Sequence, residues 1–94
     1  MIGILVCGDN HFIVEGPRPD GNTALVLARY WSIIQIGSAI PDSLRGWSIV
    51  TRAFREYLEW AIIVPGDGEI TPAIALLLEE LLARGIVIVR VVED

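Results

Sequence analysis

Residues 61–92, AIIVPGDGEITPAIALLLEELLARGIVIVRVV, contain the clearest structural pattern in the chain. The run Ala61–Val64 is apolar at every position, as expected of a strand that is covered on both faces. A helix follows, because Thr71–Pro72 is a strong helix start and Gly85 is a typical helix end. The next run, Ile86–Val92, is apolar again except for one arginine. The stretch therefore predicts a strand, a helix and a second strand.

The preceding residues, 1–60, predict further strands and helices. Phe12–Val14 is either a short hairpin partner of the first strand or an extended exit from it. Apolar residues recur with helical spacing between Ser48 and Glu59, although Trp47–Thr51 also fits a short strand. The remaining predicted elements are a strand at Ile2–Cys7, a helix that is capped by Asn22 or Thr23 and runs to about Trp31, and a strand at Ser32–Ile36.

The order of these elements indicates the fold class. Strands that alternate with helices are typical of βαβ units, which build parallel sheets through right-handed crossovers. We therefore predict a single α/β domain over residues 1–94, with three layers and a mostly parallel sheet of four or five strands. The alternative is a mixed sheet, in which Phe12–Val14 pairs antiparallel with the first strand.

The composition is more apolar than expected for so small a domain. Hydrophobic residues make up 53% of the 94 residues and charged residues only 20%, against roughly 25% charged residues in average soluble chains. A small domain has a high surface-to-volume ratio and should be more polar than average. Part of the apolar surface is therefore expected to face another chain, and a two-fold homodimer is the commonest such arrangement.

The charge and the apolar runs also indicate which partners and locations are disfavoured. The net charge of −5 and the sequence pI of about 4.7 disfavour nucleic-acid binding, which needs clustered cations. No apolar run approaches the roughly 20 residues of a membrane-spanning helix, and no signal-peptide pattern is present. Cys7 is the only cysteine, which is typical of a reducing compartment. We therefore expect a cytoplasmic protein that does not enter a membrane.

Two acidic loops that follow apolar strands form the candidate site. Gly8–His11 follows the first strand, and Pro65–Thr71 follows the strand at 61–64. Ligands of parallel sheets bind outside the carboxyl ends of the strands, so the two loops would meet there if these strands are neighbours. Carboxylate oxygens are ligands that suit Mg²⁺ or Mn²⁺. The predicted metal ligands are Asp9, Asp67 and Glu69, with Asn10 and His11 as further ligand-binding residues.

The glycines of the second loop support a different ligand. Gly66 and Gly68 allow the backbone to approach a ligand closely, and the free N–H groups at a helix start attract phosphate. Asp67 and Glu69 oppose an anion unless a metal ion lies between them. The simpler interpretation is a structural turn, because aspartate, asparagine and glycine are the residues that form turns.

These loops also resemble two pieces of the PIN/NYN-type nuclease pattern. In that pattern an acidic residue ends the first strand, and a Gly-Asp-Gly-Asp-like turn precedes a later helix. Cys7–Asn10 and Gly66–Glu69 are similar to those two pieces. The resemblance covers only these residues, and no intervening acidic residue of the pattern is placed.

Three tryptophans, Trp31, Trp47 and Trp60, are many for a chain of this size. Indoles are enriched at protein interfaces, where they supply a large apolar area with one polar group. Each of the three also lies beside a predicted element boundary, so packing in the core explains them equally well.

Two classes of function follow from these observations. The favoured one is a small self-associating α/β interaction or regulatory module without catalytic activity, because an excess of apolar surface is accompanied by no complete catalytic set. The alternative is a metal-dependent hydrolase or a nucleotide-binding domain that uses the two acidic loops. That alternative requires Asp9, Asp67 and Glu69 to lie within one ligand shell.

Overall fold

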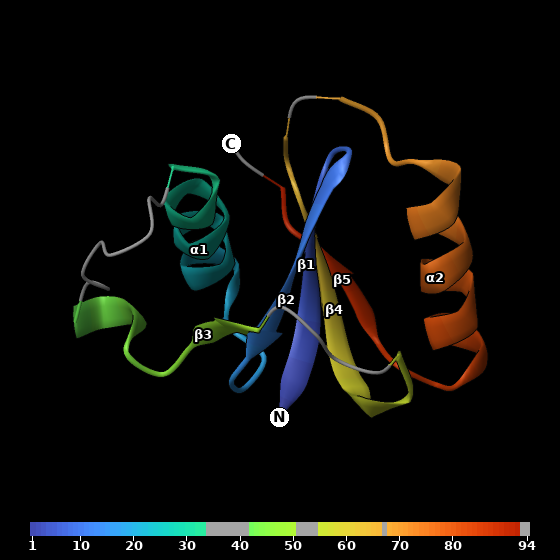
Figure 1. The fold of residues 1–94 in the computed structure, drawn as a ribbon, viewed down its shortest axis with the longest axis horizontal. Coiled ribbons are helices and arrows are strands. Elements are labelled where there is room, and N and C mark those ends of the chain that lie inside the picture. The colour runs from blue at the N-terminus through green and yellow to red at the C-terminus, as the bar shows by residue number, and fades with distance from the viewer. Residues whose placement is uncertain (34–41, 51–54, 67, 93–94) are drawn as a thin grey trace.

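The computed structural model describes residues 1–33, 42–50, 55–66 and 68–92, which form five strands and two helices (Figure 1). In chain order these elements are β1 (Ile2–Cys7), β2 (Asn10–Glu15), α1 (Gly21–Ile33), β3 (Ser48–Val50), β4 (Leu58–Val64), α2 (Pro72–Ala83) and β5 (Ile88–Arg90). Single turns of 3₁₀ helix lie at Asp42–Leu44 and Arg55–Tyr57.

Strands β1 and β2 form a tight hairpin. Cys7 pairs with Asn10, so only Gly8 and Asp9 lie in the turn. Gly8 has a φ of 62°, which fits a type II′ turn, because glycine is favoured at the first central position of that turn. A parallel connection needs a dozen or more residues, so a two-residue turn makes the second strand antiparallel. The predicted alternative, in which Phe12–Val14 pairs antiparallel with the first strand, is confirmed.

The five strands form one mixed sheet in the order β3-β2-β1-β4-β5. Strand β4 is parallel to β1 and β5, whereas β2 is antiparallel to β1 and β3. The predicted three-layer α/β domain with a mostly parallel sheet is therefore wrong: the sheet is mixed, and the described residues contain only two helices. The two helices lie on opposite sides of the sheet (Figure 1).

Two further predicted elements also differ from the structure. The predicted strand Ser32–Ile36 begins inside α1, and its last three residues lie outside the described residues. The predicted helix Ser48–Glu59 is wrong, because Ser48–Val50 pairs with β2 as strand β3 and Leu58 already belongs to β4. Apolar positions from two strands had mimicked the spacing of one helix. The alternative of a short strand within residues 47–51 is confirmed.

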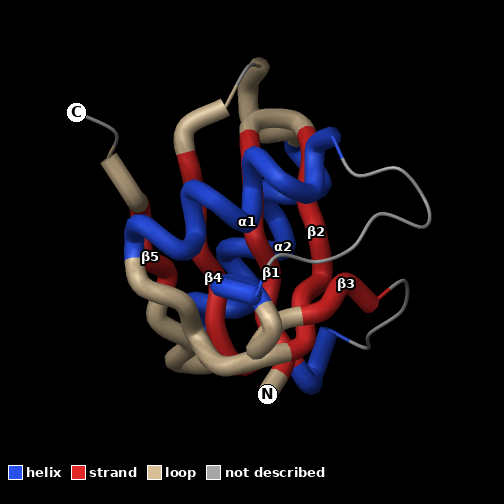
Figure 2. The backbone as a smooth tube through the Cα atoms, turned by 90° about the vertical axis from the view of Figure 1, so that its left-hand side faces the viewer, coloured by secondary structure: helices blue, strands red, loops and turns tan. Residues whose placement is uncertain are grey.

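The core consists of two clusters, one on each face of the sheet. Residues of β1 alternate between them: Leu5 packs under α1, whereas Ile4 and Val6 pack under α2. Figure 2 looks onto the face that α1 covers and shows the helix lying across the strands. The central strand is thus covered on both faces, as its unbroken apolar sequence predicts. No described helix is long and apolar enough to cross a lipid bilayer.

Helix α1 is capped by Asp20, not by Asn22 or Thr23 as predicted. The Asp20 carboxylate accepts a hydrogen bond from the Thr23 N–H at 2.7 Å. This satisfies one of the free N–H groups at the helix start. Hydrogen bonds from Thr23 lower the pKa of Asp20 below its ordinary value of 3.8.

Helix α2 begins where the sequence predicts. Thr71 is the N-cap residue, and its hydroxyl oxygen accepts a hydrogen bond from the Ile74 N–H at 3.3 Å. Pro72 occupies the first helical position, where no N–H is needed. Gly85 follows the helix with a φ of 82°, a conformation that glycine adopts readily.

Replacing Thr71 with alanine is expected to lower the free energy of unfolding by about 1 kcal/mol, because the capping hydrogen bond is lost. Thr71→Ser keeps the hydroxyl and should cost much less. Urea unfolding of both variants measures the difference. Equal losses from serine and alanine would show that the hydroxyl does not stabilise the helix.

Candidate functional site

The two loops predicted to form a site lie side by side. Strands β1 and β4 are parallel neighbours, and their last paired residues are Cys7 and Val64. The β1–β2 turn therefore meets the loop that leaves β4 at the same edge of the sheet. The adjacency on which the predicted site depends is present.

Gly66 packs directly against the end of β1. A Cβ atom at Gly66 would overlap the Cys7 sulfur and would lie 3.0 Å from the Cys7 carbonyl carbon. The Cys7 thiol donates a long hydrogen bond to the Pro65 carbonyl oxygen, with an Sγ–O distance of 3.6 Å. Gly66 thus allows its loop to cross the end of β1, which is a structural role.

Gly68 makes the second close approach. A Cβ at this position would lie 3.2 Å from Asp9 Oδ1, and the residue has a φ of 96°. Both the backbone conformation and the contact with the Asp9 carboxylate favour glycine here. The sequence indicated that these glycines permit a close backbone approach, and in the structure the neighbour that they approach is the β1–β2 hairpin.

The predicted metal ligands are only partly placed. Asp9 and Glu69 are exposed, and Asp67 lies outside the described residues. Asn10 and His11 are also exposed and form the start of β2. Among the residues that the structure describes, no group of three His, Cys, Asp or Glu side chains is arranged to hold a metal ion.

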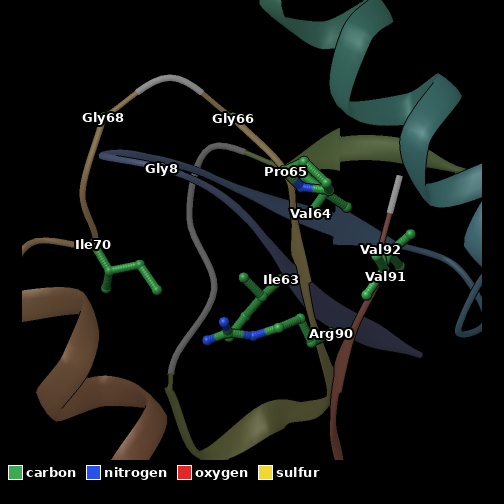
Figure 3. Close-up of a pocket in the computed structure, with 10 residues that line it drawn as sticks. All are labelled: Gly8, Ile63, Val64, Pro65, Gly66, Gly68, Ile70, Arg90, Val91 and Val92. Atoms are coloured by element: carbon green, nitrogen blue, oxygen red, sulfur yellow. The ribbon is translucent and has the colours of Figure 1, made fainter. Parts of the chain in front are cut away.

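A hollow of about 660 Å³ lies beside these loops, at the carboxyl ends of β4 and β5. Among the described residues that line it, Arg90 on β5 is the only charged one, and its side chain lies beside Ile63, to which it is paired across the sheet (Figure 3). The rest of the lining is apolar or glycine: Gly8, Ile63, Val64, Pro65, Gly66, Gly68, Ile70, Val91 and Val92.

The chemistry of this hollow does not suit the predicted divalent metal ion. A guanidinium group repels a divalent cation and pairs with carboxylate or phosphate. In the sequence, Arg90 stands out only as an interruption of an apolar run. The feature that could have indicated a site is a single charge near the end of a predicted strand, because parallel sheets bind their ligands there.

Two of the three tryptophans have structural contacts within the chain. Trp60 is only 2% exposed, and its indole N–H donates to the Gly16 carbonyl oxygen at 3.0 Å. Trp47 is half-buried, and its indole N–H donates to the Pro17 carbonyl oxygen at 2.6 Å. These two indoles hold the loop between β2 and α1 against the sheet. The side chain of Trp31 is outside the described part of the structure.

Comparisons with known proteins give no relative: no family model, no curated protein and no solved structure matches the chain.

Proposed function

We propose that the protein is a self-associating interaction module, which acts by assembly and not by catalysis. The observation that carries this proposal is the distribution of exposed apolar side chains. Four large ones belong to the C-terminal unit of α2, β5 and their flanks: Leu76 at 61% exposure, Leu82 at 60%, Val87 at 61% and Val92 at 75%.

The two elements of this unit are unusually apolar for a surface. The sequence of α2, PAIALLLEELLA, has only Glu79 and Glu80 as polar residues. Its buried stripe faces the sheet, and the opposite side also presents leucine and alanine. A helix with so few polar residues is ordinarily covered on more than one side. Strand β5 lies at the margin of the sheet, and the exposed valines Val87 and Val92 flank it. An edge of this kind favours pairing with another chain.

Light scattering over a wide range of protein concentrations tests this proposal. We expect a mass that rises to that of a dimer, since two-fold dimers are the commonest closed assemblies. The double variant Val87→Lys, Val92→Lys should remain monomeric at concentrations where the wild type associates. Val26→Lys is the matched control, because Val26 is a 46% exposed valine on α1. A monomeric wild type at every concentration would refute the proposal.

A second candidate function is the binding of a small anionic ligand such as a nucleotide. The observation that favours it is the position of Arg90 in a hollow with apolar walls, at the carboxyl ends of parallel strands. The volume of about 660 Å³ falls within the range of small-molecule sites. The apolar walls would contact a base, and the guanidinium would pair with a phosphate.

Amide chemical shifts, measured while AMP or inorganic phosphate is added, test this second candidate. AMP should shift the amides of Gly66, Gly68 and Val91, and Arg90→Gln should abolish the shifts. Arg45→Gln is the control, because Arg45 is equally cationic but pairs with Asp42 at 3.0 Å, away from the hollow. Shifts that persist in Arg90→Gln, or that never occur, would exclude the site.

A further inference from the structure

We infer that two copies of the chain pair through the free edges of their β5 strands, antiparallel and about a two-fold axis at Val89. The two five-stranded sheets would then form one continuous sheet. This inference rests on the proposed self-association and adds which surface is used and in which register. It is derived from the hydrogen-bonding direction of β5, from its side chains and from symmetry.

The outward hydrogen-bonding groups of β5 follow from its pairing with β4. The Val91 N–H donates to the Ile63 carbonyl oxygen at 2.8 Å, so Val91 and Val89 direct their main-chain groups towards β4. Backbone direction alternates along a strand. Within β5, the N–H and C=O groups of Ile88 and Arg90 therefore face away from the sheet. No described strand lies on that side, because β5 ends the strand order.

The side chains of this edge favour pairing over solvation. Residues 86–92, IVIVRVV, contain no proline and only one charge. Edge strands that stay unpaired are ordinarily protected by several charges, proline, a bulge or a covering element. Of these protective features, the described part of β5 has only the charge of Arg90. The aliphatic stem of this arginine can also pack against an apolar neighbour.

The other candidate surfaces fit a second copy less well. The opposite edge strand, β3, is as short as β5, but it begins with the exposed Ser48. Its flanks, Gly46-Trp47 and Thr51-Arg52, are also less apolar than the valine- and isoleucine-rich flanks of β5. The outer side of α2 carries Glu79 and Glu80 near its middle. A two-fold axis through that side would bring these carboxylates close to their own copies, and like charges repel. The β5 edge has no such repulsion, provided that its arginines do not face each other.

Symmetry restricts the register to a few possibilities. A two-fold axis perpendicular to an antiparallel pair places one residue opposite its own copy. If that residue is Arg90, two guanidinium groups lie directly opposite each other, which is destabilising. If it is Val91, only residues 90–92 of the segment 86–92 overlap between the two copies. With Val89 on the axis, Ile88 faces Arg90 of the second copy, and residues 86–92 overlap completely.

The register on Val89 also satisfies the outward hydrogen-bonding groups. Ile88 and Arg90 of opposite copies form hydrogen-bonded pairs. If the pairing extends past the ends of β5, the Val92 N–H reaches the Ile86 carbonyl of the other copy. The Ile86 N–H is already used, since it donates to the Leu81 carbonyl oxygen at 3.0 Å. Val89 then faces its own copy in a pair without hydrogen bonds, in which Cα atoms lie about 4.5 Å apart.

Disulfide cross-linking tests this register. In a Cys7→Ala background, Val89→Cys should give a covalent dimer on oxidation, because about 4.5 Å lies within the Cα separation of disulfides. Val91→Cys alone should not. Cross-linking only in a mixture of the two variants would place the axis at Arg90, and cross-linking of Val91→Cys alone would place it at Val91. Either result would overturn the inference.

Two further measurements keep the inference separate from the proposed function. If light scattering shows a dimer and no cysteine variant cross-links, the axis does not lie at residues 89–91 and the inference fails, although self-association stands. Amide hydrogen exchange of the unmodified protein gives an answer that needs no variant. The Ile88 and Arg90 amides should exchange more slowly at high than at low protein concentration. A rate that does not depend on concentration in a proven dimer would overturn the inference.

Discussion

Replacing Gly3 with alanine is expected to lower the free energy of unfolding by about 3 kcal/mol, at the upper end of overpacking effects. Gly3 lies on the central strand opposite Trp60, whose indole packs over it. An added Cβ would overlap atoms of the indole ring. The ring is 2% exposed and is held by a hydrogen bond to Gly16, so it cannot move aside without opening the core.

Gly46→Ala is the matched control for this substitution. A Cβ at Gly46 would meet no atom within 4 Å, so the same chemical change should leave stability nearly unaltered. Urea unfolding, followed by circular dichroism, compares the two variants with the wild type. Similar midpoints for Gly3→Ala and Gly46→Ala would show that the indole does not occupy the space above Gly3.

The second large effect is expected from Leu81→Ala, which should cost about 3 kcal/mol. Leu81 is fully buried on α2 against Ile4 and Val6, so its truncation leaves a cavity between the helix and the sheet. For a domain of this size, such a loss lowers the Tm by roughly 10–20 °C.

The neighbouring residue provides the control. Leu82→Ala makes the same change in the same turn of the helix, but Leu82 is 60% exposed. Its effect on Tm in dilute solution should be small, as for other exposed substitutions. Calorimetry at a concentration where the protein is monomeric separates the two variants. Equal Tm shifts would mean that α2 packs on the sheet through another side.

The region from β4 to β5 could be predicted because its signals are local. A proline and a threonine start α2, a glycine ends it, and apolar runs mark the strands on either side. These signals act within a few residues and do not depend on the rest of the chain. For the same reason Thr71 was identified correctly as a cap.

The direction of β2 and the identity of β3 could not be settled in the same way. Phe12–Val14 fitted a hairpin strand or an extended exit, and the decision rests on how Gly8 closes the turn. Residues 48–59 have apolar spacing that fits a helix. Pairing of Ile49 with Val14 and burial of Leu58 outweigh that local preference.

The candidate site was predictable only up to the adjacency of its loops. Once β1 and β4 are neighbours, the turn at Asp9 and the loop at Gly68 must meet. The side chains that line the resulting hollow depend also on β5, the next strand of the sheet. The register between β4 and β5 places Arg90 beside Ile63. No spacing within a single loop contains that information.

The position of β1 at the centre of the sheet has a consequence for synthesis on the ribosome. Its hairpin with β2 is complete once residue 15 has emerged, and hairpins close within microseconds. Its other edge pairs with β4, whose residues 58–64 are translated much later. Throughout the translation of residues 16–57 the nascent chain therefore presents an apolar strand with one open side. Strand β1 therefore gains its second neighbour only once β4 has been made, long after its hairpin with β2 can close.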